Sequence, residues 1–235
     1  WMGNLLRKHG DPSDALDYFK FALRIKQATL GSDDIDVANT LFNTAVLLDD
    51  LEKFELSLVA YKEALRIRKL VLGDKSPEVA DTLFCMGNVA TAMEKHSDAL
   101  AYFKESIELM ETLIKEADPS INEKDDNLLF IFNPPSIPLD QKSQYEKLNQ
   151  AYEEALPLTK LIMGSDHANV CDILTRMGDL YKTLHDWDNA AGSFQGAVRA
   201  RRAETPDDDG YEVAELLQKK GVTHLYKREF IRAKA

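Results

Sequence analysis

The sequence predicts an all-α protein made of stacked antiparallel helical hairpins, because one pattern of residues returns at a fixed interval. Three sets recur 42 residues apart: Gly31 and Gly73, Val37-Ala38 and Val79-Ala80, and Thr40-Leu41 and Thr82-Leu83. A constant spacing of this length indicates one supersecondary unit that is copied and stacked, each copy burying its apolar face against its neighbours. Within a unit, apolar residues return at steps of three and four, the period of one helix face.

The pattern begins and stops inside a unit. It is already halfway through a unit at Met2-Gly3, and it ends at Ala233 within another. Because terminal repeats normally carry a polar capping face, we expect the sequence to be a segment of a longer array.

The third unit shows the expected hairpin most clearly. A first helix is predicted from Pro77 to about Ala92, where six residues share one face: Val79, Ala80, Leu83, Met86, Gly87 and Ala90. Ser76-Pro77-Glu78 supplies its start signal, with a hydroxyl cap, a proline that needs no N–H there and an acid near the positive helix end. A second helix is predicted from about Ser97, with a buried side formed by Ala99, Leu100, Phe103, Ile107 and Leu109.

Gly87 indicates close helix packing, since glycine inside a helix costs about 1 kcal/mol relative to alanine. Small residues fill the equivalent position of other units, and small residues also stand twelve positions later: Gly3, Ala45, Gly178 and Gly221, then Ala15, Ser57, Ala99, Ala190 and Ala233. We expect these two positions to face each other, so that the helices of a hairpin approach closely. Large residues should fill the space beside them: Phe19, Tyr61, Phe103, Tyr152 and Phe194.

This arrangement resembles the tetratricopeptide repeat, a helical hairpin with a small residue in its first helix and alanine, an aromatic residue and alanine in its second. The fifth unit carries the pattern as Leu174, Met177, Gly178, Tyr181, Ala190, Phe194 and Ala197. The usual period is about 34 residues, and the extra residues here fall in a longer second helix and a Leu-Gly turn. The 42-residue form is similar to the repeats of kinesin light chain. The resemblance implies a right-handed tetratricopeptide solenoid.

The period fails in the middle of the chain. Gly73 and Gly164 are 91 residues apart, seven more than two periods, and prolines between them forbid a continuous helix. We therefore expect three parts: residues 1–115 with units one (partial) to three, a proline-rich insertion at 116–142 with a degraded helix near 126–132, and residues 143–235 with units four (partial) to six (partial). The second helix of unit four should begin near Ser143, and Pro157 should kink or split it.

Composition excludes several classes of function. The formal net charge of −11 disfavours phosphate backbones and anionic lipids as partners, so we expect neither nucleic-acid nor membrane binding. No apolar run reaches the roughly 18 residues that a spanning helix needs and no secretory signal opens the chain, which predicts a cytoplasmic protein. Cys85 and Cys171 lack the spacing of a zinc site, and no catalytic motif occurs. We expect no metal, no cofactor and no enzymatic activity.

In tetratricopeptide arrays the first helices line a concave groove, and the resemblance implies a peptide-binding surface there. The candidate residues lie on three predicted first helices: Asn39, Phe42 and Asn43, then Asp81, Phe84 and Asn88, then Asp172, Arg176, Asp179 and Lys182. The carboxamides of Asn43 and Asn88 can pair with a peptide backbone, and Phe42 and Phe84 offer an apolar floor. For any one of these residues, a solvated or inter-repeat role is the alternative.

We do not expect this chain to bind the peptides that kinesin light chain repeats bind. Kinesin light chain repeats bind peptides that hold an aromatic residue among acids, through basic groove residues, whereas this stripe contains Asp49, Asp81, Asp172 and Asp179. An acidic peptide should therefore be repelled by the amino-terminal units. A basic cluster within residues 199–228 could receive an acidic partner, although Glu204 and Asp207-Asp208-Asp209 are expected to neutralise it. The apolar run Leu128–Phe132 is either a docking segment or, as we favour, a shortened packed helix.

The sequence thus predicts an adaptor or scaffold for protein–protein interaction that holds a peptide segment of a protein partner in the concave groove. Two alternatives stay open. One is a structural subunit of a larger multiprotein assembly, with the convex or lateral faces as its contact surfaces. The other is a regulatory array of a larger enzyme.

Overall fold

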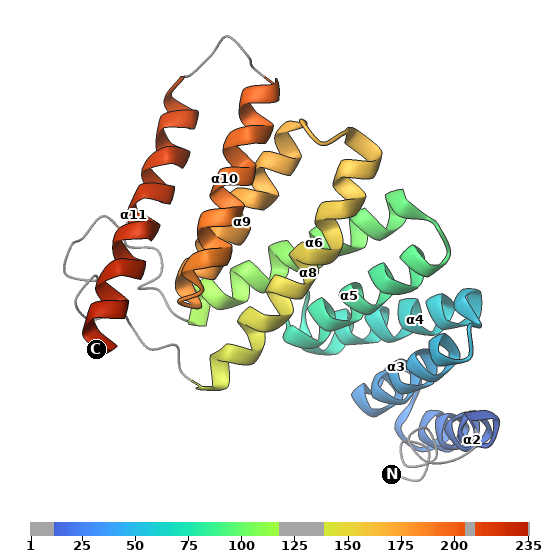
Figure 1. Ribbon diagram of the computed structural model, residues 1–235. Helices are drawn as coiled ribbons and strands as arrows, with labels where there is room; N and C mark the ends of the chain where they lie inside the picture. The colour runs from blue at the N-terminus through green and yellow to red at the C-terminus, as the bar shows by residue number, and fades with distance from the viewer. Residues whose placement is uncertain (1–11, 118–138, 205–209, 235) are drawn as a thin grey trace. The chain divides into compact units, whose positions relative to one another are not determined.

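The computed structural model describes residues 12–117, 139–204 and 210–234, and every regular element in these ranges is a helix (Figure 1). The all-α prediction is confirmed. The chain divides into two compact units, Trp1–Leu113 and Ile114–Ala235. The helices are α2 (Pro12–Leu30), α3 (Ile35–Asp50), α4 (Phe54–Leu72), α5 (Pro77–Ala92), α6 (His96–Ala117), α8 (Leu139–Met163), α9 (Ala168–Thr183), α10 (Trp187–Glu204) and α11 (Tyr211–Lys234).

The helices pair as antiparallel hairpins with three-residue turns. In three of these turns a residue other than glycine adopts a left-handed backbone with φ of 57° or 58°: Glu52, Glu94 and His185. The N–H of the following residue then donates to a carbonyl five residues earlier, as from Lys53 to Leu48 at 2.8 Å and from Lys95 to Ala90 at 2.9 Å. These bonds satisfy carbonyls at the end of each first helix.

The Leu-Gly turn between hairpins depends on glycine for its backbone. Gly31, Gly73 and Gly164 have φ values of 92°, 86° and 94°, and Gly73 combines this with ψ of 166°. An L-residue with a side chain is strained there. The repeated glycine that revealed the period in the sequence is thus the residue that ends each second helix and starts the next hairpin.

Side-chain caps fix where the first helices begin. Ser76 accepts a hydrogen bond from the Val79 N–H at 3.2 Å, and α5 runs from Pro77 to Ala92 as the sequence predicts. The Asp34 carboxylate caps α3 by accepting from the Asp36 N–H at 2.8 Å. His167 caps α9 through Nδ1, which accepts from the Asn169 N–H at 3.1 Å.

The glycines inside the first helices allow an aromatic ring of the second helix to lie directly on the backbone. A Cβ atom added to Gly87 would lie 2.6 to 2.8 Å from ring carbons of Phe103, and one added to Gly178 would lie 2.5 to 2.8 Å from Phe194. We expected the aromatic residues to stand beside this small position, and the structure instead places their rings over it.

The second small position contacts the backbone of the first helix. Ser57 is fully buried, and its hydroxyl donates to the Ala45 carbonyl at 2.8 Å. Ala45 is the residue that takes the place of Gly87 in the preceding hairpin, and Tyr61 packs against it. The two small residues therefore face each other as predicted, and the pair brings α3 and α4 into close contact.

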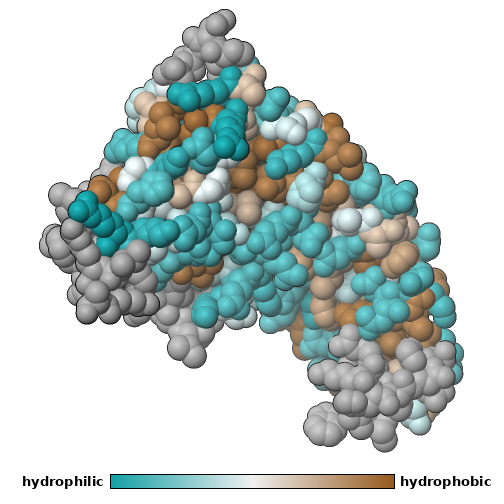
Figure 2. All heavy atoms as spheres, in the orientation of Figure 1, coloured by the Kyte–Doolittle hydropathy of each residue, from teal (hydrophilic) through white to brown (hydrophobic). Residues whose placement is uncertain are grey.

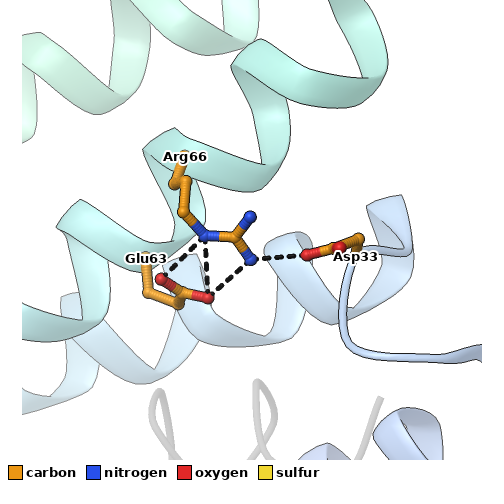
Figure 3. Close-up of polar contacts among 3 residues, drawn as sticks. All are labelled: Asp33, Glu63 and Arg66. Atoms are coloured by element: carbon orange, nitrogen blue, oxygen red, sulfur yellow. Dashed lines mark hydrogen bonds and ion pairs between the residues drawn. The ribbon is translucent and has the colours of Figure 1, made fainter.

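Polar contacts also join second helices to neighbouring turns. Arg66 of α4 donates to Glu63, one helical turn earlier, at 2.8 Å, and to Asp33 in the turn before α3 at 2.5 Å (Figure 3). These groups are about half exposed, so solvent screens both pairs and they contribute little to stability.

The middle of the chain tests one prediction about a helix. Helix α8 begins at Leu139, four residues before the predicted start, and continues to Met163 with Pro157 inside it. Proline therefore does not split this helix. The predicted insertion at 116–142 falls largely on residues 118–138, and it lies outside the described residues together with the run Leu128–Phe132 and the acids at 207–209. No helix in the described ranges is both long and apolar enough to cross a membrane.

Candidate peptide-binding face

Residues that the sequence analysis predicts for a groove lie on α3 and α5 of the first unit, and this set is here called the α3–α5 face. It contains Asn39, Phe42, Asn43, Val46 and Asp49 of α3 and Asp81, Phe84, Cys85 and Asn88 of α5. All nine are half-buried, which is the exposure expected for residues that line a shallow surface between two helices. Below them lies a buried cluster of Ala45, Tyr61, Met86 and Val89.

Arg68 of α4 joins the two helices beneath this face. Its Nη2 donates to Asn39 Oδ1 at 3.0 Å, and its Nη1 donates to Thr82 Oγ1 at 2.7 Å and to the Glu78 carbonyl at 3.0 Å. The guanidinium carbon also lies 4.4 Å from the centre of the Phe42 ring. One side chain therefore fixes Asn39 and Phe42 of α3 relative to the first turns of α5.

Burial lowers the pKa of Arg68, and the charges of Glu78 and Asp81 partly oppose that shift. The side chain is only 6% exposed, and its Nε has no hydrogen-bond acceptor among the described residues. A buried guanidinium needs hydrogen bonds to offset its lost hydration. The contacts with Asn39, Thr82 and Glu78 supply these hydrogen bonds. Asn39 accepts from Arg68 through its side-chain oxygen, and its amide N–H groups make no hydrogen bond among the described residues.

A second polar contact lies farther along the face. Tyr61 of α4 and Cys85 of α5 are hydrogen-bonded through their side chains, and burial raises the pKa of both groups, that of Cys85 to about 11. Both side chains are therefore neutral near pH 7. The Phe42 ring meets the Tyr61 ring edge to face at 5.3 Å, and the Phe84 ring lies 5.7 Å from that of Phe103. The aromatic floor is thus held by the second helices.

Three polar side chains of the face have no hydrogen-bond or ion-pair partner among the described residues. Neither Asn43 nor Asn88 makes a side-chain hydrogen bond within the described ranges, and the Asp49 carboxylate there accepts none and forms no ion pair. Burial and the neighbouring charge of Asp50 raise the pKa of Asp49. Two free carboxamides and one free carboxylate, placed around partly buried aromatic rings, are groups that can bind a polypeptide.

The candidate residues of the second unit differ in this respect. On α9, Arg176 donates to Asp172 at 3.0 Å, and Asp179 accepts from Lys219 of α11 at 2.7 Å. Lys182 has a partner as well. Asp179 thus has an inter-helix contact with α11, whereas Arg176 and Asp172 pair with each other one turn apart within α9.

The basic cluster near the carboxyl end is also paired internally. Arg201 forms ion pairs with Glu204 and Glu212, Lys227 pairs with Asp188, and Lys220 donates to Gln195. Acids of α10 and α11 thus neutralise Arg201 and Lys227, and Glu204 is the acid among them that the sequence analysis expected. Among the described residues, no group of three or more histidine, cysteine or acidic side chains could hold a metal ion.

Arg68 is the residue of this site that sequence reasoning missed. It stands next to Ile67 and four residues after Ala64, both of which are fully buried, so helical periodicity places it on the buried side of α4. A cation on an apolar helix face was the signal that could have found it.

A family comparison identifies the repeat. The family model described as tetratricopeptide repeat matches residues 1–70 and 50–112. Residues 1–112 are tetratricopeptide repeats. The predicted family is thus confirmed for this part of the chain, which contains the whole α3–α5 face. A search of curated proteins finds no match.

Several solved structures resemble this chain. The assembly chaperone of RpL4 (Acl4) is 12% identical, with a TM-score of 0.52, and the match covers 99% of this chain and 88% of that one. The nearly identical TPR-like repeats described as a kinesin light chain of Podosopora anserina are 9% identical, with a TM-score of 0.44 and coverage of 87% and 93%. Aspartyl phosphate phosphatase F from Bacillus subtilis is 15% identical, with a TM-score of 0.44 and coverage of 99% and 57%. At 12% identity the likeness to Acl4 shows the fold alone, and the other two matches add nothing to it because their TM-scores are below 0.5.

Proposed function

We propose that this chain is a protein-interaction adaptor and that the α3–α5 face holds an extended peptide segment of a partner protein. Tetratricopeptide repeats generally mediate protein–protein interaction, which agrees with the family match of residues 1–112. The observation that carries the proposal is the pair Asn43 and Asn88, whose carboxamides have no partner in the described structure.

The geometry supports an extended ligand. A carboxamide both donates and accepts, so it can form two hydrogen bonds with one peptide unit of an extended backbone. Asn43 and Asn88 belong to adjacent first helices, and a segment that crosses the face can use both. Phe42 and Phe84 are already fixed by Tyr61, Arg68 and Phe103, so the receptor loses little side-chain entropy on binding.

The test is a selection of peptides with and without the two carboxamides. Ten-residue peptides displayed on phage are selected on the unsubstituted chain, and their affinities are then measured by fluorescence anisotropy. The double variant Asn43→Ala, Asn88→Ala should bind the selected peptides at least about tenfold more weakly, since two hydrogen bonds are lost. Gln27→Ala, which removes an exposed carboxamide of α2 in the same unit, is the matched control and should leave the affinity unchanged. Equal affinity for all three proteins would refute the proposal.

A structural subunit is the second candidate, and exposed apolar side chains favour it. Leu70, Val71 and Leu72 at the end of α4 are 62%, 46% and 39% exposed. Leu161, Ile162 and Met163 occupy the same place before the turn glycine in α8 and are 65%, 40% and 37% exposed. Apolar patches of this kind are visible among the polar surface in Figure 2. If they are contact surfaces of an assembly, Leu70→Glu should remove co-purifying partners while peptide binding at the α3–α5 face is retained.

A further inference from the structure

Asp49 is the most unusual charged residue of the α3–α5 face. It lies in the last turn of α3, half-buried, and within the described part of the chain its carboxylate has neither a hydrogen-bond donor nor a cation. A carboxylate that is partly removed from water without a partner costs free energy. The negative end of the helix dipole adds to this cost. The position is therefore unfavourable in the free protein and favourable for a ligand that supplies a positive charge.

Within the described part of the chain, no lysine or arginine forms an ion pair with Asp49. Tyr61 of α4 and Cys85 of α5 lie within its electrostatic influence, and both are neutral near pH 7. Asp50 next to it adds a second negative charge. Arg68 contacts Asn39, ten residues earlier in α3, which is about 15 Å along the helix. Arg68 also lies near Glu78 and Asp81, which balance its charge.

We propose that the α3–α5 face selects peptide segments that place a lysine or arginine side chain on Asp49. This inference rests on the proposed function and names the chemistry of the partner. Val46 stands three residues before Asp49 on the same side of α3 and packs with the apolar cluster, so it offers a surface to the methylene stem of a long basic side chain. Asn43 and Asn88 then hold the backbone on either side.

Charge complementarity favours a basic segment over an acidic one. The chain carries 40 acidic and 29 basic residues, Asp49 and Asp81 belong to the face, and Asp50 lies next to Asp49. An acidic segment would meet repulsion along this surface, while a basic one would be attracted before contact. The partner is thus a protein that exposes an extended segment with at least one lysine or arginine.

The experiment extends the peptide selection with charge variants. The library is selected in parallel on the unsubstituted chain, on Asp49→Asn, on Asp50→Asn and on the Asn43→Ala, Asn88→Ala double variant. Asp50 is the matched control because it is adjacent in sequence and exposed. Lysine and arginine should be enriched in the pools from the unsubstituted chain and from Asp50→Asn, and that enrichment should be absent from the Asp49→Asn pool.

Affinity measurements then locate the contact. Replacing the selected lysine with norleucine should weaken binding to the unsubstituted chain about tenfold, and binding to Asp49→Asn by no more than about twofold. Binding of the lysine peptide should also weaken as the pH falls and Asp49 takes up a proton, and Asp49→Asn should lose this dependence. The other groups near Asp49 are Asp50, Tyr61 and Cys85, and the last two stay protonated throughout this acidic range.

The outcomes separate this inference from the proposed function. Peptides that need Asn43 and Asn88 but show no basic preference, or a basic preference that survives in Asp49→Asn, would overturn the role of Asp49 and leave peptide binding intact. A selection in which no peptide depends on Asn43 and Asn88 would overturn both.

Discussion

At the scale of single residues, a glycine in the first helix decides how closely the two helices of a hairpin pack. Gly178 lies directly under the Phe194 ring, and its missing side chain is what allows this contact. Gly192 of α10 is also inside a helix, but a Cβ atom added there would meet nothing within 4 Å. Both glycines lie inside helices, but only Gly178 has a side chain packed against the place where a Cβ atom would be.

We predict that Gly178→Ala destabilises the protein by about 1 to 3 kcal/mol, because the new Cβ atom forces the ring away from the helix. Gly192→Ala should stabilise it by about 0.5 to 1 kcal/mol, since alanine favours the helix and meets open space. Urea denaturation followed by circular dichroism measures both. A stabilising Gly178→Ala would show that the ring moves without cost, as in the hairpin where Ala45 meets Tyr61.

Cys85 gives a second prediction at this scale. Its pKa of about 11 results mainly from burial, with further contributions from Asp81 and Asp49. At pH 8 its thiolate fraction should be about two hundredfold below that of an ordinary thiol with a pKa near 8.5. Alkylation by iodoacetamide, followed residue by residue with mass spectrometry, should be correspondingly slow and should accelerate about tenfold per pH unit up to pH 10. A rapid reaction at pH 8 would contradict this environment.

The sequence revealed residues whose role is local and missed those whose role depends on neighbouring helices. Ser76 could be recognised as a cap because capping needs only the next three residues. Arg68 could not be assigned its partners, because Asn39 lies 29 residues before it and Thr82 lies 14 residues after it. The same limit applies to Asp179, because its partner Lys219 lies 40 residues later, on α11.

At the scale of elements, helix periodicity was sufficient where a unit is regular. Helix α5 has the predicted bounds, since its cap, its first-turn proline and its apolar face all lie within it. Helix α8 shows that of the two expected effects of Pro157, a kink or a split, the split does not occur. Pro157 removes one backbone donor, but Ala155, Leu158 and Thr159 around it are buried, and this packing maintains the helix despite the local penalty.

Arg68 of α4 contacts α3 and α5, and two replacements of it can distinguish the contribution of its volume from that of its charge and hydrogen bonds. Arg68→Ala should destabilise the protein by about 2 to 4 kcal/mol, because it leaves a cavity and unpaired acceptors between α3 and α5. Arg68→Met should recover at least about half of this loss, since methionine fills the space without a buried charge. Met110 occupies the equivalent position 42 residues later and is 5% exposed.

Thermal and urea unfolding of both Arg68 variants measure this difference. Lys104→Met, which removes another cation of a second helix in the same unit, controls for the change in net charge. If Arg68→Met were as destabilising as Arg68→Ala, the hydrogen bonds of the guanidinium rather than its volume would hold α3 to α5.

At the scale of the whole molecule, each hairpin is stabilised by the hairpins next to it. The buried clusters combine residues of consecutive helices, such as α2, α3 and α4, or α3, α4 and α5. In proteins built this way, stability is close to a sum of terms for each repeat and for each interface between neighbours. A local defect should therefore remain local, unlike a defect in a globule with a single core.

Hydrogen–deuterium exchange with mass spectrometry can test this locality with Gly178→Ala. Amides of α9 and α10 should exchange about tenfold faster or more, because a loss of 1.4 kcal/mol in local opening free energy corresponds to a factor of ten. The adjoining α8 and α11 should respond less, and α3, α4 and α5 should keep the exchange rates of the unsubstituted chain. Gly192→Ala, measured in parallel, should slow exchange in α10 alone. Uniform acceleration throughout both units would mean that the chain unfolds as a single cooperative body, and the sum of neighbour terms would then be the wrong description of its stability.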